Sequence, residues 1–253
     1  MAGTAGRARR PILNLTFIDA PSPNFDARPS PPDMVVIHYT GMPTGEAALA
    51  RLCDPVPPRV SSHWLIETDG RLFRLVPEER CAWHAGVSFW KGEKNLNAAS
   101  IGIELVNPGH EFGYIDFPDA QIATLIDLLG EIRARWTIPD ARILGHSDLA
   151  PDRKTDPGER FPWAALAAAG HGLWVEPPPS PGPPLGEGEK GTGVFALQAG
   201  FTRLGYDCAP SGEFDAATKQ VVEAFQRHWR PSQVDGVADG ETRARLVGLL
   251  RLL

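Results

Sequence analysis

Four short runs in the first half of the chain are dense in apolar, β-branched and aromatic residues, and they predict β-strands. The runs span residues 34–40 (MVVIHYT), 62–67 (SHWLIE), 71–76 (RLFRLV) and 100–106 (SIGIELV). Asp69-Gly70 separates the second run from the third, and such a pair is the usual signal of a tight two-residue hairpin whose central residues have positive φ. We therefore expect these two strands to form a hairpin.

Apolar residues with helical spacing follow the fourth run. Residues 119–136 repeat them every three or four positions, which predicts an amphipathic helix packed on a sheet, with Pro118 at its first position. Residues 47–52 and 163–169 predict two shorter helices. The fold class is therefore α/β, with a mixed central β-sheet flanked by helices.

Residues 194–253 show three helical stripes and no strand pattern. A pattern Gly-x-x-Asp-x-x-Thr precedes the second and the third stripe, at Gly212 and Gly236, and its aspartates Asp215 and Asp239 can cap helix N-termini. This segment predicts a small all-α three-helix domain. It has no cluster of histidine, cysteine or acidic residues, so binding is its expected role.

A proline- and glycine-rich run, PPPSPGPPLGEGEKGTG, fills residues 177–193. Proline-rich segments adopt extended polyproline II, so we expect this run to hold two domains apart. The predicted organisation is an α/β domain at 1–176, a linker at 177–193 and a helical domain at 194–253.

Composition excludes several classes of protein. The 25 Lys+Arg against 31 Asp+Glu leave a net charge of −6, which gives no basic excess for nucleic acid. No window approaches the ~18 uninterrupted apolar residues of a membrane span. The N-terminus, MAGTAGRARRPILNL, lacks the apolar core of a secretory signal. The absence of a recognised signal favours the cytoplasm.

Polar residues with catalytic potential lie in three separate segments of the first domain. His38 ends the first strand, and later segments carry Gly145-His146-Ser147-Asp148 and Lys154-Thr155-Asp156. Two histidines and an aspartate from these segments can meet, and three N/O ligands suit a catalytic Zn²⁺ because the fourth position stays free for water. On spacing alone, a hydrogen-bonded core histidine is the alternative.

Five segments together resemble one family in order and spacing. They are IHYT (37–40), SSHWLI (61–66), WHAG (83–86), SIGIELVNPG (100–109) and GHSDLAPDRKTDPG (145–158). The family is the zinc-dependent N-acetylmuramoyl-L-alanine amidases of the type-2 amidase and peptidoglycan-recognition-protein fold, and the resemblance covers residues 33–165. It implies hydrolysis of the amide between the lactyl group of N-acetylmuramic acid, or its 1,6-anhydro form, and L-alanine of the stem peptide, in wall turnover or recycling.

The resemblance also implies roles for individual residues. His38, His146 and Asp156 would hold one Zn²⁺ per chain, Glu104 would be the general base, and Lys154 would stabilise the oxyanion. Glu104 lies between apolar neighbours, which can raise its pKa toward the working pH. The alternatives are a surface strand glutamate and a solvated loop lysine.

Further residues are candidates for the substrate groove. His84 and His63 can contact substrate or be structural, His84 being the stronger candidate. Tyr39 can be a packing residue or can support the neighbouring His38. Trp83 can stack on the sugar or peptide of a substrate or can belong to the core. Asn95 stands where the resemblance expects an arginine for a stem-peptide carboxylate, so the neighbouring Lys94 is the candidate replacement as a point charge. Asn97 is retained from the family pattern.

The C-terminal segment resembles the three-helix peptidoglycan-binding module of cell-wall hydrolases. The resemblance rests on GEFDAAT at 212–218 and AFQ at 224–226. It implies peptidoglycan or muropeptides as partner and no protein partner. A polymer-binding module favours the periplasm or export by a non-classical route, against the cytoplasmic expectation. The competing function is a non-catalytic peptidoglycan-recognition protein on the same fold. Because every proposed catalytic residue lies in the first domain, we expect the module to be dispensable for chemistry.

Overall fold

The computed structural model describes residues 15–253. Residues 1–14, which make up nearly all of the segment assessed for a secretory signal, lie outside the described residues. Within the described part, no helix combines the length and the apolar character needed to cross a membrane.

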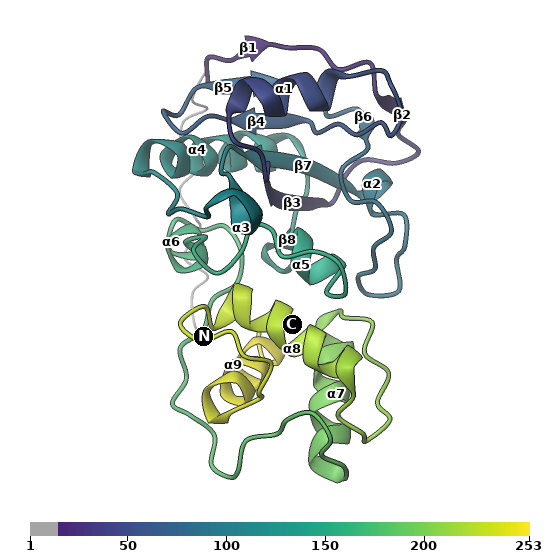
Figure 1. Ribbon diagram of the computed structural model, residues 1–253, viewed down its shortest axis with the longest axis vertical. Helices are drawn as coiled ribbons and strands as arrows, with labels where there is room; N and C mark the ends of the chain where they lie inside the picture. Colours follow the sequence, from purple (N-terminus) through teal and green to yellow (C-terminus); the bar gives the residue numbers. More distant parts are fainter. Residues whose placement is uncertain (1–14) are drawn as a thin grey trace, which may run out of the picture.

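A six-stranded sheet forms the centre of the N-terminal half (Figure 1). Its order is β1 (Ile18–Asp19), β5 (Leu72–Arg74), β4 (Trp64–Ile66), β7 (Ser100–Leu105), β3 (Met34–Tyr39) and β8 (Ile143–Gly145). β4 and β5 pair in antiparallel order, whereas the other neighbours are parallel. The predicted mixed sheet is confirmed. A separate two-stranded sheet joins β2 (Phe25–Ala27) to β6 (Arg80–Ala82).

The turn between β4 and β5 differs from the two-residue turn that the sequence predicts. The Gly70 N–H donates to the carbonyl of Glu67 at 2.9 Å, and the Glu67 N–H donates to the carbonyl of Arg71 at 2.9 Å. These bonds enclose three residues, and Gly70 has a φ of +88° whereas Asp69 does not have a positive φ. A three-residue loop needs positive φ only at its last position, which explains the difference.

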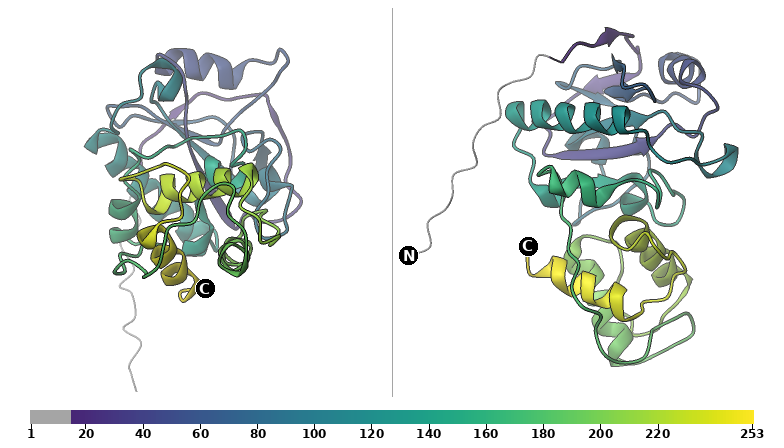
Figure 2. Two further views of the ribbon diagram at one scale, coloured as in Figure 1. Left: turned by 60° about the horizontal axis from the view of Figure 1, so that its bottom comes forward. Right: turned by 90° about the vertical axis from the view of Figure 1, so that its left-hand side faces the viewer.

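Helices cover both faces of the sheet, because its strands alternate their apolar side chains. Val35 and Ile37 pack on one face with helix α4 (Asp119–Arg135). Leu65 and Phe73 point to the other face, where they pack with helix α1 (Gly45–Cys53). Figure 2 shows α4 and α1 on opposite sides of the strands. Short helices α2 (Leu96–Ala99), α3 (Gly109–Phe112), α5 (His146–Leu149) and α6 (Trp163–Ala168) complete this half.

Three helices form the C-terminal module, as predicted. They are α7 (Thr192–Leu204), α8 (Ala216–Trp229) and α9 (Gly240–Leu250). The carboxylates of Asp215 and Asp239 accept the backbone N–H of Thr218 and Thr242, each at 2.8 Å. The two predicted N-caps are therefore confirmed.

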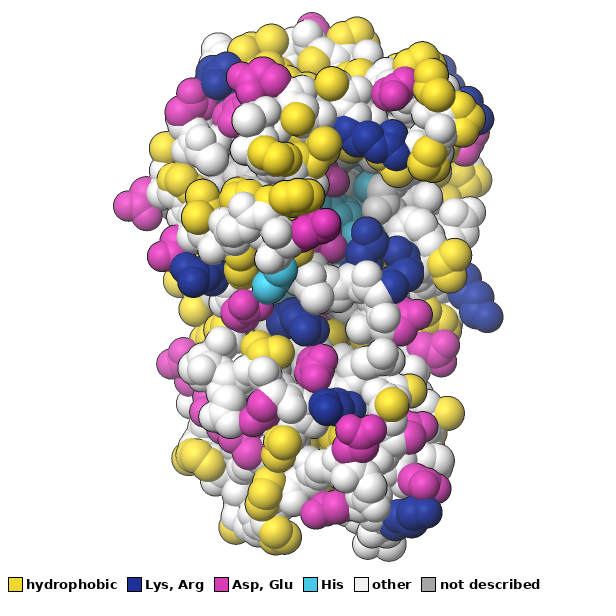
Figure 3. Space-filling model, in the orientation of Figure 1, with side chains coloured by type: hydrophobic (Ala, Val, Ile, Leu, Met, Phe, Trp, Pro, Cys, Tyr) yellow, Lys and Arg dark blue, Asp and Glu magenta, His cyan; other side chains and the backbone are white. Residues whose placement is uncertain are grey.

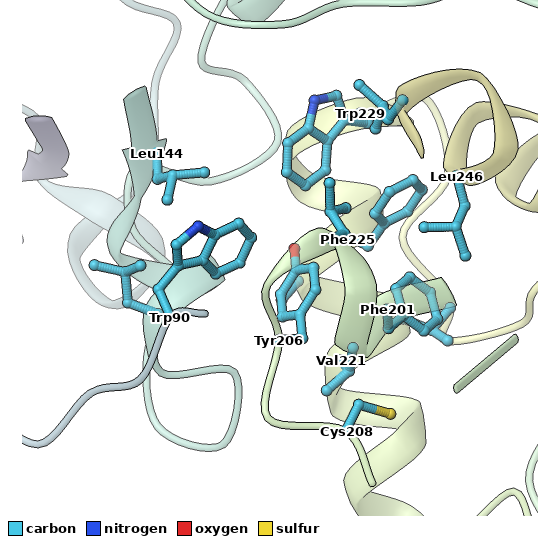
Figure 4. Packing of buried hydrophobic residues seen from close by; sticks show 14 of the residues in the cluster. Trp90, Leu144, Phe201, Tyr206, Cys208, Val221, Phe225, Trp229 and Leu246 are labelled. Atoms are coloured by element: carbon cyan, nitrogen blue, oxygen red, sulfur yellow. The ribbon is translucent and has the colours of Figure 1, made fainter. Parts of the chain in front are cut away.

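The proline-rich run does not hold the two halves apart. One hydrophobic cluster contains Trp90 and Leu144 from the first half together with Phe201 and Tyr206 from the module (Figure 4). The run itself pairs along the module, since Leu185 forms a β-bridge with Ala238. Burying these large side chains is favourable, and that gain outweighs the stiffness expected of the prolines.

Candidate active site

The predicted site residues gather at the carboxyl ends of adjacent parallel strands. β3 lies between β7 and β8, and His38 on β3 is the register partner of Glu104 on β7. Ile37 is paired with Gly145, the last residue of β8, so His146 follows at the same edge of the sheet. Ligand sites of open sheets are commonly built at this edge.

Three side-chain atoms form a compact triangle at this edge. His38 Nδ1 lies 2.9 Å from Asp156 Oδ2, His146 Nδ1 lies 3.2 Å from the same oxygen, and the two nitrogens are 3.1 Å apart. All three residues are buried. Ligands about 2.0–2.1 Å from a tetrahedral Zn²⁺ lie roughly 3.3 Å from one another, close to the edges of this triangle. The group can therefore bind a metal ion.

The outer nitrogen of His146 fixes the tautomer of its ring. His146 Nε2 lies 3.1 Å from the carbonyl oxygen of Ala85, which can only accept a hydrogen bond. The proton of the neutral ring is therefore on Nε2, and Nδ1 offers a lone pair to the triangle. Such a contact on the outer nitrogen is typical of metal-binding histidines.

A longer hydrogen-bond chain fixes the tautomer of His38. The Ser100 hydroxyl donates to the carbonyl of Leu96, so it accepts from His84 Nε2 at 3.2 Å. His84 Nδ1 then has no proton and accepts from His38 Nε2 at 3.0 Å. His38 is thereby left with a bare Nδ1 in the triangle. His84 therefore orients the His38 ring by accepting its Nε2–H.

The surroundings of His38 and Asp156 keep both groups in the protonation states that a metal ligand needs. Burial lowers the pKa of His38 to about 4, against the hydrogen bond to Asp156 that raises it. Burial alone would raise the pKa of Asp156, but His146 and His38 hold that pKa well below its usual range. At neutral pH, His38 is uncharged and Asp156 is a carboxylate.

Glu104 has the environment of a proton-transfer group. Burial, with the nearby Asp156 charge, raises its pKa well above the ordinary value, although Lys154 opposes the shift. Its Oε2 atom is buried and has no hydrogen-bond partner among the described residues. A carboxylate oxygen without a partner at the site is available to a water or a substrate proton.

A pocket of about 410 Å³ brings most of the predicted residues together. Figure 3 shows it as a recess with histidine surface inside and Lys and Arg side chains around it. The predicted residues that line it are His38, His146, Asp156, Glu104, Lys154, His84, Tyr39 and Trp83. The Tyr39 hydroxyl lies 3.0 Å from Thr155 Oγ1 and 3.0 Å from His110 Nδ1, and Tyr39 and Thr155 are the sequence neighbours of His38 and Asp156.

Three predicted substrate contacts lie elsewhere. His63 is fully buried, and its ring contacts the Arg28 guanidinium and accepts from the Gly102 N–H, so it is not accessible to a substrate. Asn97 Oδ1 accepts the backbone N–H groups of His84 and Ala85, and it therefore holds the loop that carries His84. Lys94 is exposed and does not line the pocket.

The pocket lining also contains two arginines that were not predicted from the sequence. Arg51 from α1 and Arg153 beside Lys154 add positive charge to its lining. Arg153 was detectable because it belongs to the GHSDLAPDRKTDPG segment, whereas Arg51 lies in a helix without any motif. Gly102 on β7, outside the pocket lining, is a further residue that was not predicted. A Cβ at Gly102 would lie 2.5 Å from His84 Cγ, so only glycine leaves room for the His84 ring.

Comparisons with known proteins agree with this geometry. A family model for N-acetylmuramoyl-L-alanine amidase matches residues 28–159, and a peptidoglycan-binding domain model matches residues 190–246. The chain belongs to the N-acetylmuramoyl-L-alanine amidase family. It is 37% identical over 237 residues to N-acetylmuramoyl-L-alanine amidase AmiD of Escherichia coli (strain K12), covering 86% of this chain and 82% of that protein.

Other relatives and solved structures support the assignment. The 1,6-anhydro-N-acetylmuramyl-L-alanine amidase AmpD of Citrobacter freundii is 36% identical over 58% of this chain and 87% of its own length. AmiD from E. coli, solved with the substrate anhydro-N-acetylmuramic acid-L-Ala-D-gamma-Glu-L-Lys, superposes with a TM-score of 0.74 at 36% identity, covering 88% of this chain and 90% of that one. AMPDH3 from Pseudomonas aeruginosa gives 0.73 at 31% identity, with 88% and 92% coverage.

Proposed function

We propose that this amidase uses one Zn²⁺, held by His38, His146 and Asp156, to hydrolyse the muramoyl-L-alanine amide bond with water as the nucleophile. The observation that carries the proposal is the triangle of two bare Nδ1 atoms and one carboxylate oxygen, with edges of 2.9–3.2 Å. Two nitrogens and one oxygen form a donor set that suits a catalytic zinc. When bound there, zinc would polarise the scissile carbonyl and make a water molecule more acidic.

Glu104 and Lys154 are the residues that we assign to proton transfer and charge stabilisation. Glu104 takes a proton from the attacking water while the water oxygen forms a bond to the lactyl carbonyl carbon. The Lys154 ammonium stabilises the negative charge that develops on the carbonyl oxygen. Glu104 then delivers the proton to the amide nitrogen, the C–N bond breaks, and the products are the lactyl carboxylate and a free L-alanine amine. The raised pKa of Glu104 favours this second transfer.

Matched variants separate the base from the ligands. Glu104→Gln should retain zinc and lose most turnover, whereas His146→Ala should lose the zinc itself. Turnover is followed by mass spectrometry of the stem peptide released from muropeptides, and zinc content by metal analysis. Loss of zinc in the Glu104 variant would show that Glu104 is a ligand and not a base.

The same assay distinguishes the competing functions. A recognition protein would bind muropeptides and release nothing with zinc present. A peptidase cutting within the stem would give fragments of different mass.

Support for 1,6-anhydro-muropeptides as substrates comes from the relatives. The E. coli structure with a TM-score of 0.74 holds an anhydro-muramyl peptide, and the C. freundii relative is named for the anhydro substrate. We assign the recognition of stem-peptide carboxylates to positive side chains of the pocket lining, among them Arg51, because Asn95 replaces the expected arginine. Comparing release from anhydro and from reducing-end muropeptides tests the substrate form.

A further inference from the structure

A buried carboxylate links the metal site to the C-terminal module. Asp148 is the third residue of helix α5, which begins at His146, and it is 1% exposed. Its Oδ2 accepts the backbone N–H of Gly145 at 2.8 Å, immediately before the ligand. The other contacts of this carboxylate come from the module, where His228 Nδ1 lies 2.7 Å from Oδ2 and the Tyr206 hydroxyl lies 2.7 Å from Oδ1.

The partners of Asp148 are themselves held firmly. His228 is 2% exposed, and its ring is stacked 3.6 Å from Trp163 of α6 on one side and 3.6 Å from Trp229 of α8 on the other. Tyr206 packs edge-on against Trp90 with 5.0 Å between the ring centroids. Figure 4 shows Tyr206 beside Trp90 where the two halves meet. The two donors therefore reach Asp148 from a rigid surface.

The docking geometry is specific as well as tight. The Lys91 N–H donates to the carbonyl of Gly205 at 2.8 Å, and a Cβ at Gly205 would lie 2.4 Å from Trp90 Cε2. Only glycine permits this approach, which brings the adjacent Tyr206 over α5. A four-residue helix such as α5 has too few internal hydrogen bonds to be stable alone. Its position therefore depends on contacts with other parts of the protein.

We propose that Tyr206 and His228 of the C-terminal module are positioning residues for the metal ligand His146. They fix the Asp148 carboxylate, Asp148 fixes the backbone at Gly145, and this backbone directs the His146 ring into the site. The module is then part of the metal-binding apparatus and not a dispensable attachment. This inference rests on the proposed zinc site.

The experiment measures zinc affinity of the full-length chain by competition with a chromogenic chelator. Tyr206→Phe and His228→Leu should each raise the zinc dissociation constant about ten-fold, the low end of the range for residues that orient a metal ligand, because the effect passes through Asp148. His228→Asn, which keeps an N–H donor, should restore most of the affinity. Leu249→Ala, in the module core on α9, is the control for general destabilisation and should bind zinc like the wild type.

Each outcome decides the inference. Unchanged zinc affinity in Tyr206→Phe and His228→Leu would overturn it, and so would an equal loss in Leu249→Ala. Tyr206→Phe removes a single oxygen atom, so it gives an answer even if His228→Leu does not fold. A wild-type protein that binds no zinc would refute the proposed function, whereas tight zinc binding in the wild type and all variants would refute this inference alone.

Discussion

Replacing Glu104 by glutamine should make the metal-free protein more stable at neutral pH, and the same variant with zinc bound should have lost most of its activity. Burial raises the pKa of Glu104 in the folded state well above its value of 4.5 in an unfolded chain. The folded state therefore holds the proton more tightly than the unfolded state. The stabilising contribution of the protonated acid is complete below pH 4.5 and is lost as the pH rises through the folded-state pKa.

The size of the effect follows from the contacts of the carboxylate. Glu104 Oε2 is buried without a partner among the described residues, so the ionised group has lost water without full compensation. Leaving a buried polar group unsatisfied costs about 1–3 kcal/mol, and the cost is greater for a charged group than for a neutral amide. We expect Glu104→Gln to gain about 1–2 kcal/mol at pH 7.5, or roughly 2–8 °C in Tm for a chain of this size.

The assay is thermal unfolding in a metal chelator at several pH values between 4.5 and 7.5. The variant and the wild type should converge at the acid end and separate as the pH rises. Glu159→Gln is a control of opposite sign, because the hydrogen bond from His110 lowers the pKa of Glu159. It should be neutral or slightly less stable at pH 7.5. A Glu104→Gln difference that does not change with pH would refute the reasoning.

Two other predictions concern the site. Lys154→Met should lower kcat about 10²–10³-fold in the release assay with zinc content unchanged, and a loss of zinc would contradict its assignment to the oxyanion. Gly102→Ala should displace the His84 ring, whose Cγ would be 2.5 Å from the new Cβ, and weaken zinc binding about ten-fold by chelator competition; unchanged affinity would show that the His38–His84 contact is not needed.

The sequence predicted elements whose pattern is long or dense. Met34–Tyr39 and Ser100–Leu105 are six-residue apolar strands, and the helix Asp119–Arg135 repeats its apolar residues over 17 positions. β8 has three residues, Ile143–Gly145, too few for a periodic signal. Its place beside β3 is decided by pairing across more than a hundred positions, which no local pattern records.

The candidate site could be predicted only for residues that lie in short contiguous motifs. His38, Glu104 and His146 stand at strand ends, and register alone brings them together. The contact between Asp148 and His228 joins residues 80 positions apart in different modules. Such a contact depends on how the surfaces of two folded domains pack, and no local sequence pattern records that. The composition of the proline-rich run alone therefore predicted that the two domains are held apart.

The shared core around Trp90 and Tyr206 fixes the position of the catalytic pocket relative to the C-terminal module. A module on a loose tether would let the catalytic pocket sample many bonds around each anchoring point on the wall. Here the two halves are packed together through one hydrophobic cluster, so the pocket lies at a set distance and direction from the peptidoglycan that the module binds. Each time the module binds, only stem peptides at that distance along a glycan strand would then reach the pocket. The spacing between the two halves would thus select which amide bonds are cut.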